Sequence, residues 1–245
     1  MTFDELKSLR DKSQRTTLGF FLAEGEHLVL ELARALAHRP ALASARILVS
    51  HEYLAGGLPP DFPRQLPLET LSARQMSQLS ETRTPQGVMA VVPLLAPPPS
   101  VAGERSIYLH GIQDPGNLGT ILRTLGWFGG FRCLLSPDSV DPYNAKVVRA
   151  SMGAIFSVPV ERDLTPDLLR RRHPRVALLE PRGRSLACGE FRNFDCYVFG
   201  GEAAGIPTEF ADDAAASVFS VPGKGGVESL NLATAVNICV YELCR

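Results

Sequence analysis

Three loops rich in glycine contain the polar residues of this sequence that are best suited to bind a ligand or to act on one. Paired glycines let a ligand approach the backbone closely, and the start of a helix offers free N–H donors. Each loop alone also has a simpler interpretation, because turns and helix caps favour the same residue types. The polar residues concerned are Asn117 and Arg123 in the first loop, Glu202 in the second, and Ser229 and Asn231 in the third.

The first loop does not match two common nucleotide-binding motifs. Gly111 and Gly116 have the glycine spacing of a phosphate-binding loop, but Asn117-Leu118 stands where that motif needs Lys followed by Ser or Thr. No GxGxxG pattern follows a predicted strand either, which argues against a dinucleotide-binding domain. Arg123 lies six residues after Asn117, about 600° around a helix, so helix geometry alone does not bring the two side chains together.

Composition sets limits on the class of protein. The chain has 245 residues with 25 Lys and Arg against 26 Asp and Glu, so its net charge of −1 excludes a uniformly basic protein but not a local basic patch. Its five cysteines include no CxxC pair, which argues against a disulfide framework and a structural zinc site. No apolar run reaches the length of about 18 residues that a transmembrane helix needs, and the first residues do not resemble a secretory signal. We therefore expect a cytoplasmic protein without a metal.

Three consecutive prolines at 97–99 divide the sequence, because prolines are excluded from helix interiors and central strands. We predict a small α/β domain at 1–96, a linker at 97–103 and a second α/β domain at 104–245. The first is expected to contain helices at 2–13, 24–38 and 72–79 and strands at 45–50 and 87–92. The second is expected to alternate strands at 106–109, 131–135, 175–179, 196–199 and 217–221 with helices at 118–128, 143–152, 165–172 and 230–243. Such alternation predicts a mostly parallel sheet, whose ligands usually bind beyond the carboxyl ends of the strands.

Taken together and in this order, the loops resemble the motifs of the SpoU (TrmH-like) family of RNA ribose 2′-O-methyltransferases, within the SPOUT superfamily. The matching motifs are Asn117-Leu-Gly119 with Arg123, Gly200-Gly-Glu202 with Gly205, and Glu228-Ser-Leu-Asn231 with Ala235. Segments 20–25, 84–87 and 140–153 are also similar to the family. Gly223 is a departure, since many relatives carry Met there, but it replaces no proposed catalytic group.

The resemblance implies a fold, a cofactor and an oligomeric state. The fold would be a C-terminal SPOUT domain with a parallel sheet and a deep trefoil knot, preceded by a small L30e-like α/β domain that binds the RNA substrate. The protein would be a homodimer and would use S-adenosyl-L-methionine. The matching cofactor-binding positions are Leu179, Gly183, Gly200, Gly201, Glu202, Ile206, Val221, Pro222, Ser229, Leu230 and Ala233.

The same resemblance assigns roles to the five polar loop residues. A ribose hydroxyl is a poor nucleophile, and a free arginine is a poor base because its pKa exceeds about 12. We expect Arg123 to orient the hydroxyl and an RNA phosphate, with that phosphate able to take the proton. Asn117 would hold Arg123 or the ribose, while Ser229 and Asn231 would shape the pocket. Glu202 would pair with a basic group of a second subunit, unless it is a structural carboxylate at a helix start.

Basic residues in two segments are candidates for contact with RNA phosphates, although a solvated helix face is the favoured explanation for any one of them taken alone. These residues are Lys7, Arg10, Lys12, Arg15, Lys146 and Arg149. The extra domain favours ribosomal RNA over transfer RNA as the substrate. The alternatives are a tRNA 2′-O-methyltransferase, a non-catalytic RNA-binding protein with the same fold, and a small-molecule enzyme that uses the same glycine-rich pocket.

Overall fold

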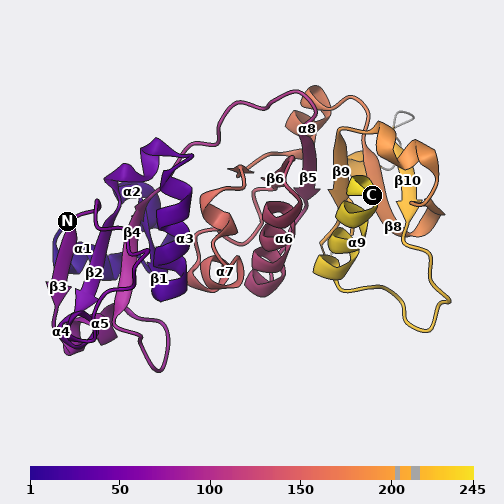
Figure 1. The fold of residues 1–245 in the computed structure, drawn as a ribbon. Helices are drawn as coiled ribbons and strands as arrows, with labels where there is room; N and C mark the ends of the chain where they lie inside the picture. The colour runs from indigo at the N-terminus through magenta and orange to yellow at the C-terminus, as the bar shows by residue number, and fades with distance from the viewer. Residues whose placement is uncertain (202–204, 211–215) are drawn as a thin grey trace. The chain divides into compact units, whose positions relative to one another are not determined.

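The computed structural model describes residues 1–201, 205–210 and 216–245, which form two compact units (Figure 1). The first unit comprises Met1–Ala96 together with Asp141–Ser157, and the second comprises Pro97–Val140 together with Val158–Arg245. The main division falls directly before the three prolines. The chain therefore crosses between the units three times, because the segment at 141–157 packs with the first unit.

The first unit contains a four-stranded sheet in the order β1-β4-β2-β3. Strand β4 is antiparallel to both β1 and β2, whereas β2 and β3 are parallel. The strands are β1 (Phe20–Glu24), β2 (Arg46–Ser50), β3 (Leu68–Leu71) and β4 (Val88–Pro93). The helices are α1 (Phe3–Ser8), α2 (Lys12–Leu18), α3 (Glu26–Leu36), α4 (His51–Ala55), α5 (Ala73–Leu79) and α7 (Ala145–Ala150), with short 3-10 turns η1 (Pro40–Ser44) and η2 (Ala154–Phe156).

Helix caps explain where the N-terminal prediction succeeds and where it is wrong. The helix predicted at 2–13 is two helices, because Asp11 caps a new one and accepts a hydrogen bond from the Ser13 N–H at 3.2 Å. The helix predicted to begin after Ser72 is confirmed, with a reciprocal capping box between Ser72 and Gln75. The strand β1 is not predicted, because its aromatic and apolar residues do not alternate with polar ones.

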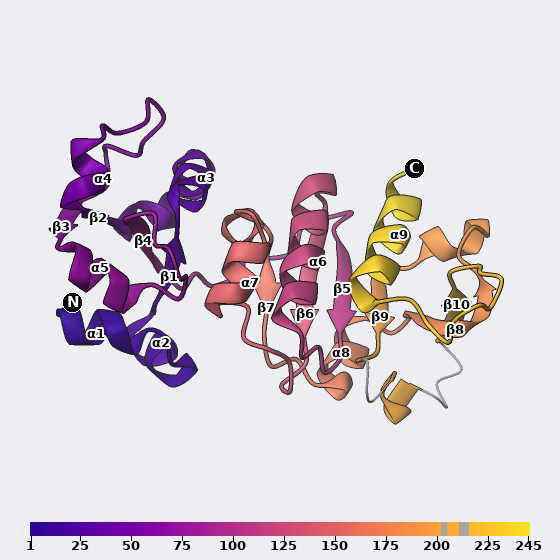
Figure 2. The ribbon, with the colours of Figure 1, turned by 90° about the horizontal axis from the view of Figure 1, so that it is seen from below.

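The second unit contains a six-stranded parallel sheet in the order β10-β8-β9-β5-β6-β7, which confirms the predicted parallel sheet (Figure 2). Its strands are β5 (Arg105–Leu109), β6 (Phe131–Leu135), β7 (Val160–Glu161), β8 (Ala177–Ser185), β9 (Cys196–Phe199) and β10 (Ser217–Ser220). Its helices are α6 (Pro115–Phe128), α8 (Pro166–Arg172) and α9 (Leu232–Cys244), with 3-10 turns η3 (Gly189–Asn193) and η4 (Thr208–Phe210). None of the helices in the described part of the chain is long and apolar enough to span a membrane.

Two features of this unit position the site. Strand β8 pairs with β10 through a register shift, since Leu178 lies opposite Val218 while Arg184 lies opposite the next residue, Phe219. Residues 179–183 therefore bulge out of the ladder. Helices α6 and α9 pack against each other, and the Thr124 hydroxyl donates to Oδ1 of Asn237 at 2.6 Å.

Candidate functional site

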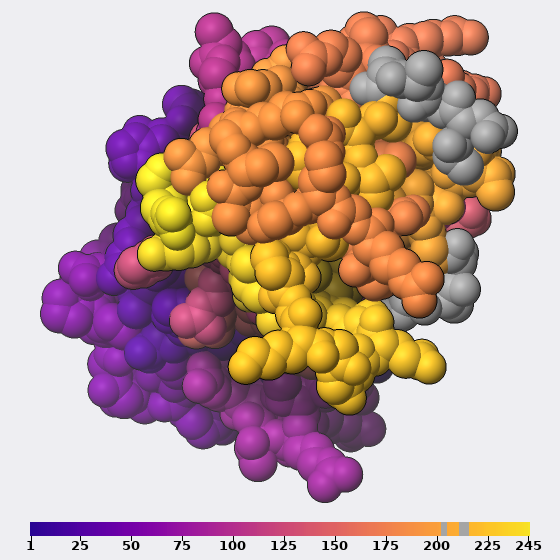
Figure 3. All heavy atoms as spheres, turned by 90° about the vertical axis from the view of Figure 1, so that its right-hand side faces the viewer, coloured from indigo at the N-terminus to yellow at the C-terminus, as the bar shows by residue number. Residues whose placement is uncertain are grey.

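A cavity of about 1080 Å³ lies beside the bulge of β8 and beyond the ends of β9 and β10. Its walls come from the β8 bulge, from the loop after β9, from the loop at 221–230, and from one side of α9. Figure 3 shows the loop at 221–230 projecting from the surface of the second unit. A crevice beyond the carboxyl ends of parallel strands is where open α/β sheets usually bind ligands.

Two glycines make the crossing of chain segments beside this cavity possible. A Cβ on Gly200 would lie 2.1 Å from the backbone carbonyl carbon of Gly205, and a Cβ on Gly201 would lie 2.8 Å from the carbonyl oxygens of His110 and Gly111. Real Cβ atoms do not approach backbone this closely, so both positions require glycine. These glycines thus let one part of the chain approach another, in addition to lining the cavity.

The polar residues of the first and third loops meet. Asn231 caps α9 by accepting from the Thr234 N–H at 3.2 Å, and its Nδ2 donates to Oδ1 of Asn117 at 3.0 Å. Asn117 itself is not the cap of α6, because Asp114 occupies that position and accepts from the Asn117 N–H at 2.7 Å. The Asn117 side chain contacts the third loop instead of capping its own helix.

The other three candidate catalytic residues lie in different settings. Ser229 is exposed and lines the cavity. Arg123 is exposed on α6 outside the cavity lining, and follows Asn117 along the same helix. Glu202 lies outside the described residues.

Most of the predicted cofactor-binding residues line this one cavity. They are Leu179, Gly200, Gly201, Ile206, Val221, Pro222, Ser229 and Leu230. Gly183 and Ala233 do not. A Cβ on Gly183 would lie 2.8 Å from the Phe219 backbone carbonyl carbon, so this glycine allows close approach of β8 to β10. Ala233 is buried within α9.

Several lining residues are not predicted from the sequence. Leu232, Ala235 and Cys239 lie on α9 at helical spacing, which could have identified them as one wall. Burial raises the pKa of the Cys239 thiol to about 12, so this wall is uncharged at neutral pH. The charged lining residues are Glu180, Arg182, Lys224 and Glu228, and only their nearness to the glycine-rich segments could have indicated them.

The prediction that Arg15 contacts RNA is wrong, because this side chain is buried inside the first unit. Arg15 is 5% exposed, and its guanidinium binds the Asp141 carboxylate at 2.5 and 2.9 Å. It also donates to the carbonyls of Leu9 and Arg10. Such a residue holds the segment at 141–157 in place and has no surface left for a phosphate.

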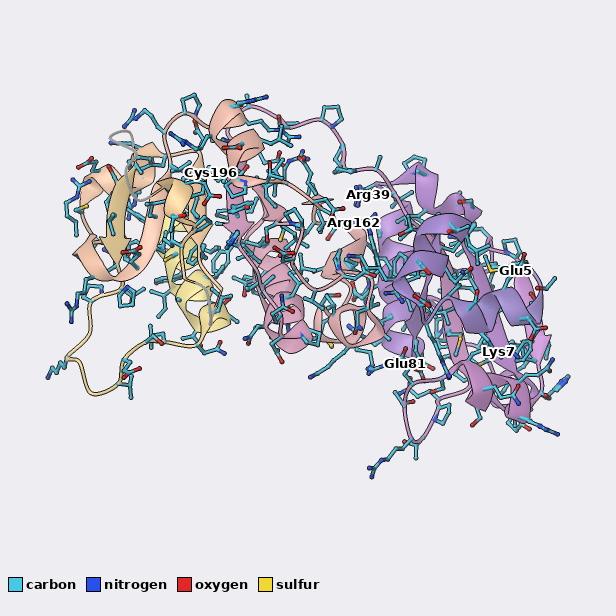
Figure 4. All side chains as sticks on the ribbon, turned by 180° about the vertical axis from the view of Figure 1, so that it is seen from behind. Glu5, Lys7, Arg39, Glu81, Arg162 and Cys196 are labelled. Atoms are coloured by element: carbon cyan, nitrogen blue, oxygen red, sulfur yellow. The ribbon has the colours of Figure 1, made fainter. Side chains whose placement is uncertain are left out.

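The remaining predicted RNA contacts differ in exposure. Lys7 pairs with Asp4 at 2.6 Å, Arg10 donates to the Gln78 and Ser80 carbonyls, and Lys12 is exposed. Lys146 is exposed on α7, and Arg149 lies near Glu24. Figure 4 shows Lys7 and Glu81 among the side chains of the first unit.

Comparisons with known proteins match both parts of the chain. Residues 104–241 match the SpoU rRNA Methylase family, and residues 4–90 match the MRM3-like substrate binding domain. The chain is 32% identical to the 23S rRNA (guanosine(2553)-2′-O)-methyltransferase RlmP of Bacillus subtilis, over 97% of this chain and 93% of that protein.

Two solved structures are similar over almost the whole chain. One is a putative RNA methyltransferase of the TrmH family from Porphyromonas gingivalis, with 32% identity, a TM-score of 0.78, and coverage of 98% of this chain and 96% of that one. The other is the AdoMet-bound rRNA methyltransferase from Sinorhizobium meliloti, with 28% identity, a TM-score of 0.74, and coverage of 98% and 93%.

Proposed function

Because this chain belongs to the SpoU rRNA methylase family, we propose that it transfers a methyl group from S-adenosyl-L-methionine to a ribose 2′-hydroxyl of RNA, with ribosomal RNA as the favoured substrate. The observation that carries the proposal is the convergence of the three motif loops, since the second and third line one cavity and Asn231 of the third binds Asn117 of the first. The full-length similarity to a ribosomal RNA 2′-O-methyltransferase supports the choice of substrate.

The cavity fits the methyl donor in size and chemistry. Its volume of about 1080 Å³ is slightly above the usual range for small-molecule pockets, so it has room for the whole donor. Leu179, Ile206 and Leu230 can cover the faces of an adenine ring, and neighbouring backbone groups can bind its edge. Glu180 and Glu228 can face positive charge. When bound, S-adenosyl-L-methionine supplies an electrophilic methyl group attached to a sulfonium.

Positioning is the main contribution that the protein can make to this reaction. Holding a hydroxyl in line with its reaction partner can lower a barrier by up to about 7–11 kcal/mol. We assign that task to Arg123, whose planar guanidinium donors orient the hydroxyl and a phosphate. Asn117 and Asn231 fix the start of α6 against the start of α9 and so fix the helix that carries Arg123. Ser229 contributes to the wall of the donor cavity.

Replacement of Arg123 separates this role from donor binding. We expect Arg123→Ala to lower single-turnover methyl transfer to ribosomal RNA by about 10²- to 10³-fold, as removal of one oriented donor does elsewhere. Calorimetric binding of S-adenosyl-L-methionine should be unchanged, because Arg123 is outside the cavity lining. Arg171→Ala, an exposed arginine on α8, is the matched control. Equal losses of donor binding and turnover would contradict the role, and label on a base would contradict ribose methylation.

We also propose that the protein is a homodimer in which α6 and α9 form the interface. Trp127 is 84% exposed and Tyr241 57% exposed on these two packed helices, and the ring of Phe128 lies 6.4 Å from that of Tyr241. Large exposed aromatic surface of this kind is typical of a protein interface. Sedimentation should give twice the chain mass for the wild type and a single chain mass for Tyr241→Glu. A monomeric wild type would refute the dimer.

The remaining assignments follow from family membership and stay proposals. Residues 1–96 would be an L30e-like RNA substrate-binding domain, 97–103 a linker, and 104–245 the methyltransferase domain with its deep trefoil knot. The knotted cofactor loops would be at 179–183, 200–206, 221–222 and 229–233, of which 202–204 lie outside the described residues. The protein would act in the cytoplasm. Refolding kinetics of the full chain would test the knot, since threading predicts a slow phase.

A further inference from the structure

One carboxylate in the first unit joins three segments that are distant in the sequence. Glu24, at the end of β1, accepts hydrogen bonds from the hydroxyls of Ser80 and Thr82 and from the Glu81 N–H at 3.2 Å. Nη1 of Arg149, on α7, lies 3.9 Å from the same carboxylate. The Glu24 side chain is 11% exposed. It therefore fixes both the loop after α5 and the helix contributed by residues 141–157.

The loop at 80–87 is held at both of its ends. At its start, Arg10 donates to the carbonyl oxygen of Ser80 at 2.8 Å. At its end, Oε1 of Gln86 accepts from the Glu26 N–H at 2.9 Å, and the Ser50 N–H donates to the Gly87 carbonyl at 2.7 Å. A loop that is already ordered loses little conformational entropy when it binds a partner.

Between these fixed ends the loop presents a cation. Arg83 and Thr84 are exposed, and Figure 4 shows Glu81 at the base of the loop. Arg149 lies on the other side of Glu24 and keeps 34% of its side chain exposed. Its buried Nη1 has no hydrogen-bond partner, so its pairing with Glu24 uses little of the guanidinium's donor capacity. Lys146 is exposed three residues earlier on the same face of α7.

We propose that this Glu24 surface, made of Glu24, residues 80–87, Lys146 and Arg149, contacts the phosphates of the RNA substrate. The inference rests on the proposed function and adds to it where the RNA binds. Arginine suits the task because its planar donors match phosphate oxygens and its charge is permanent. Among the acidic neighbours, Glu24 is satisfied internally, and Glu26 accepts from the Tyr53 hydroxyl at 2.6 Å. Glu81 is exposed within the loop and offsets part of the positive charge of Arg83.

The surface differs from the domain division that family similarity gives. The match to a substrate binding domain ends at residue 90, and residues 141–157 fall inside the match to the methylase. In the structure those residues belong to the first unit and bring Arg149 to Glu24. The RNA-binding face is therefore completed by a segment from the methylase part of the sequence.

Binding of the full chain to an in-vitro-transcribed large-subunit ribosomal RNA tests the proposal across a salt series. Arg83→Ala and Arg149→Ala should each weaken affinity about tenfold, the size of a lost charge-assisted hydrogen bond. Each should also reduce the slope of log K against log salt by about one. Arg149→Lys should keep the slope. Arg64→Ala, an exposed cation of the same unit that is not among the predicted RNA contacts, is the matched control and should change neither quantity.

If Glu24 only positions the loop at 80–87, its replacement should change RNA affinity but not the salt dependence of binding. Glu24→Gln keeps the size of the side chain but weakens the hydrogen bonds that its carboxylate accepts from the loop. Affinity for RNA should therefore fall, while the slope of log K against log salt stays at the wild-type value. Thermal unfolding of each variant shows whether it remains folded. If both arginine variants bind RNA with the wild-type affinity and salt slope while the wild type methylates that RNA, the proposal that the Glu24 surface contacts RNA is refuted. A wild type that neither binds nor methylates this RNA would instead overturn the proposed function and the surface with it.

Discussion

The two units hold distant chain segments together in different ways. In the first unit, charged side chains make the joins, as Arg15 does with Asp141 and Glu24 does with the loop at 80–87. The second unit also contains a buried ion-pair join, between Arg132 and the carboxylates of Glu104 and Glu161. In addition, its backbone approaches backbone at Gly200, Gly201 and Gly183 without any side chain between them. The difference fits the ligands proposed for each unit, because a small donor is enclosed by shape whereas an RNA backbone is attracted by charge.

Removal of the buried ion pair between Arg15 and Asp141 should lower the free energy of unfolding more than any other change proposed here. Arg15→Ala leaves the carboxylate of Asp141 buried with its main partner gone, and loss of one member of a buried ion pair costs about 3–5 kcal/mol. Urea denaturation should show that loss. Arg15→Lys should recover little of it, because one ammonium cannot replace the bonds to Asp141, Leu9 and Arg10 together. A loss below about 1 kcal/mol would mean that the pair does not hold the unit together.

Alanine substitutions at two glycines that line the same cavity test the close approach of backbone to backbone. Gly200→Ala forces a methyl group into the Gly205 backbone and should cost about 1–3 kcal/mol, with loss of donor binding. Gly223→Ala meets nothing within 4 Å and should keep both stability and binding. Differential scanning fluorimetry and calorimetric titration measure the two quantities. Equal behaviour of the two variants would contradict the role of close backbone contact.

The smallest effect near neutral pH comes from buried thiols of the second unit. Burial raises the pKa of Cys133 and of Cys239 to about 12. An unfolded thiol loses its proton near about pH 8.5, so between that pH and about 12 the unfolded chain releases protons that the folded chain keeps. The free energy of unfolding should therefore be independent of these thiols below pH 8 and should fall as pH rises above about 8.5. Urea titrations at pH 7 and 10 should show a smaller fall in the free energy of unfolding for Cys133→Ala than for the wild type. An equal fall in both proteins would contradict this assignment.

Local patterns predicted the second unit better than the first. Apolar runs predicted the observed limits of β6 and β9, because strands buried on both faces are short and mostly apolar. The exception in β6 is Arg132, which is buried in ion pairs with Glu104 and Glu161. Strand β3 was beyond such patterns, since Leu68–Leu71 is mostly exposed and pairs only at the sheet edge. The residues of the cavity were largely indicated by glycine-rich loops, whereas the wall formed by α9 depends on how that helix packs.

The roles of the basic residues could not be predicted from their spacing. Arg15 stands among other cations in the sequence, yet its partner is Asp141, 126 residues away. Whether a cation serves the interior or the surface is decided by such long-range partners. Lys146 and Arg149 remain candidates for contact with RNA, whereas the buried Arg15 does not.

The threefold crossing of the chain between the units has a consequence for how such a protein can be rearranged. A domain attached by one linker can be exchanged as a cassette during evolution or in the laboratory. Here an exchange at the prolines alone would leave Asp141, Tyr143 and Phe156 without the Arg15 and Phe21 that they contact. A chimaera with a new RNA specificity would have to receive two separate segments, 1–96 and 141–157, from the same donor protein.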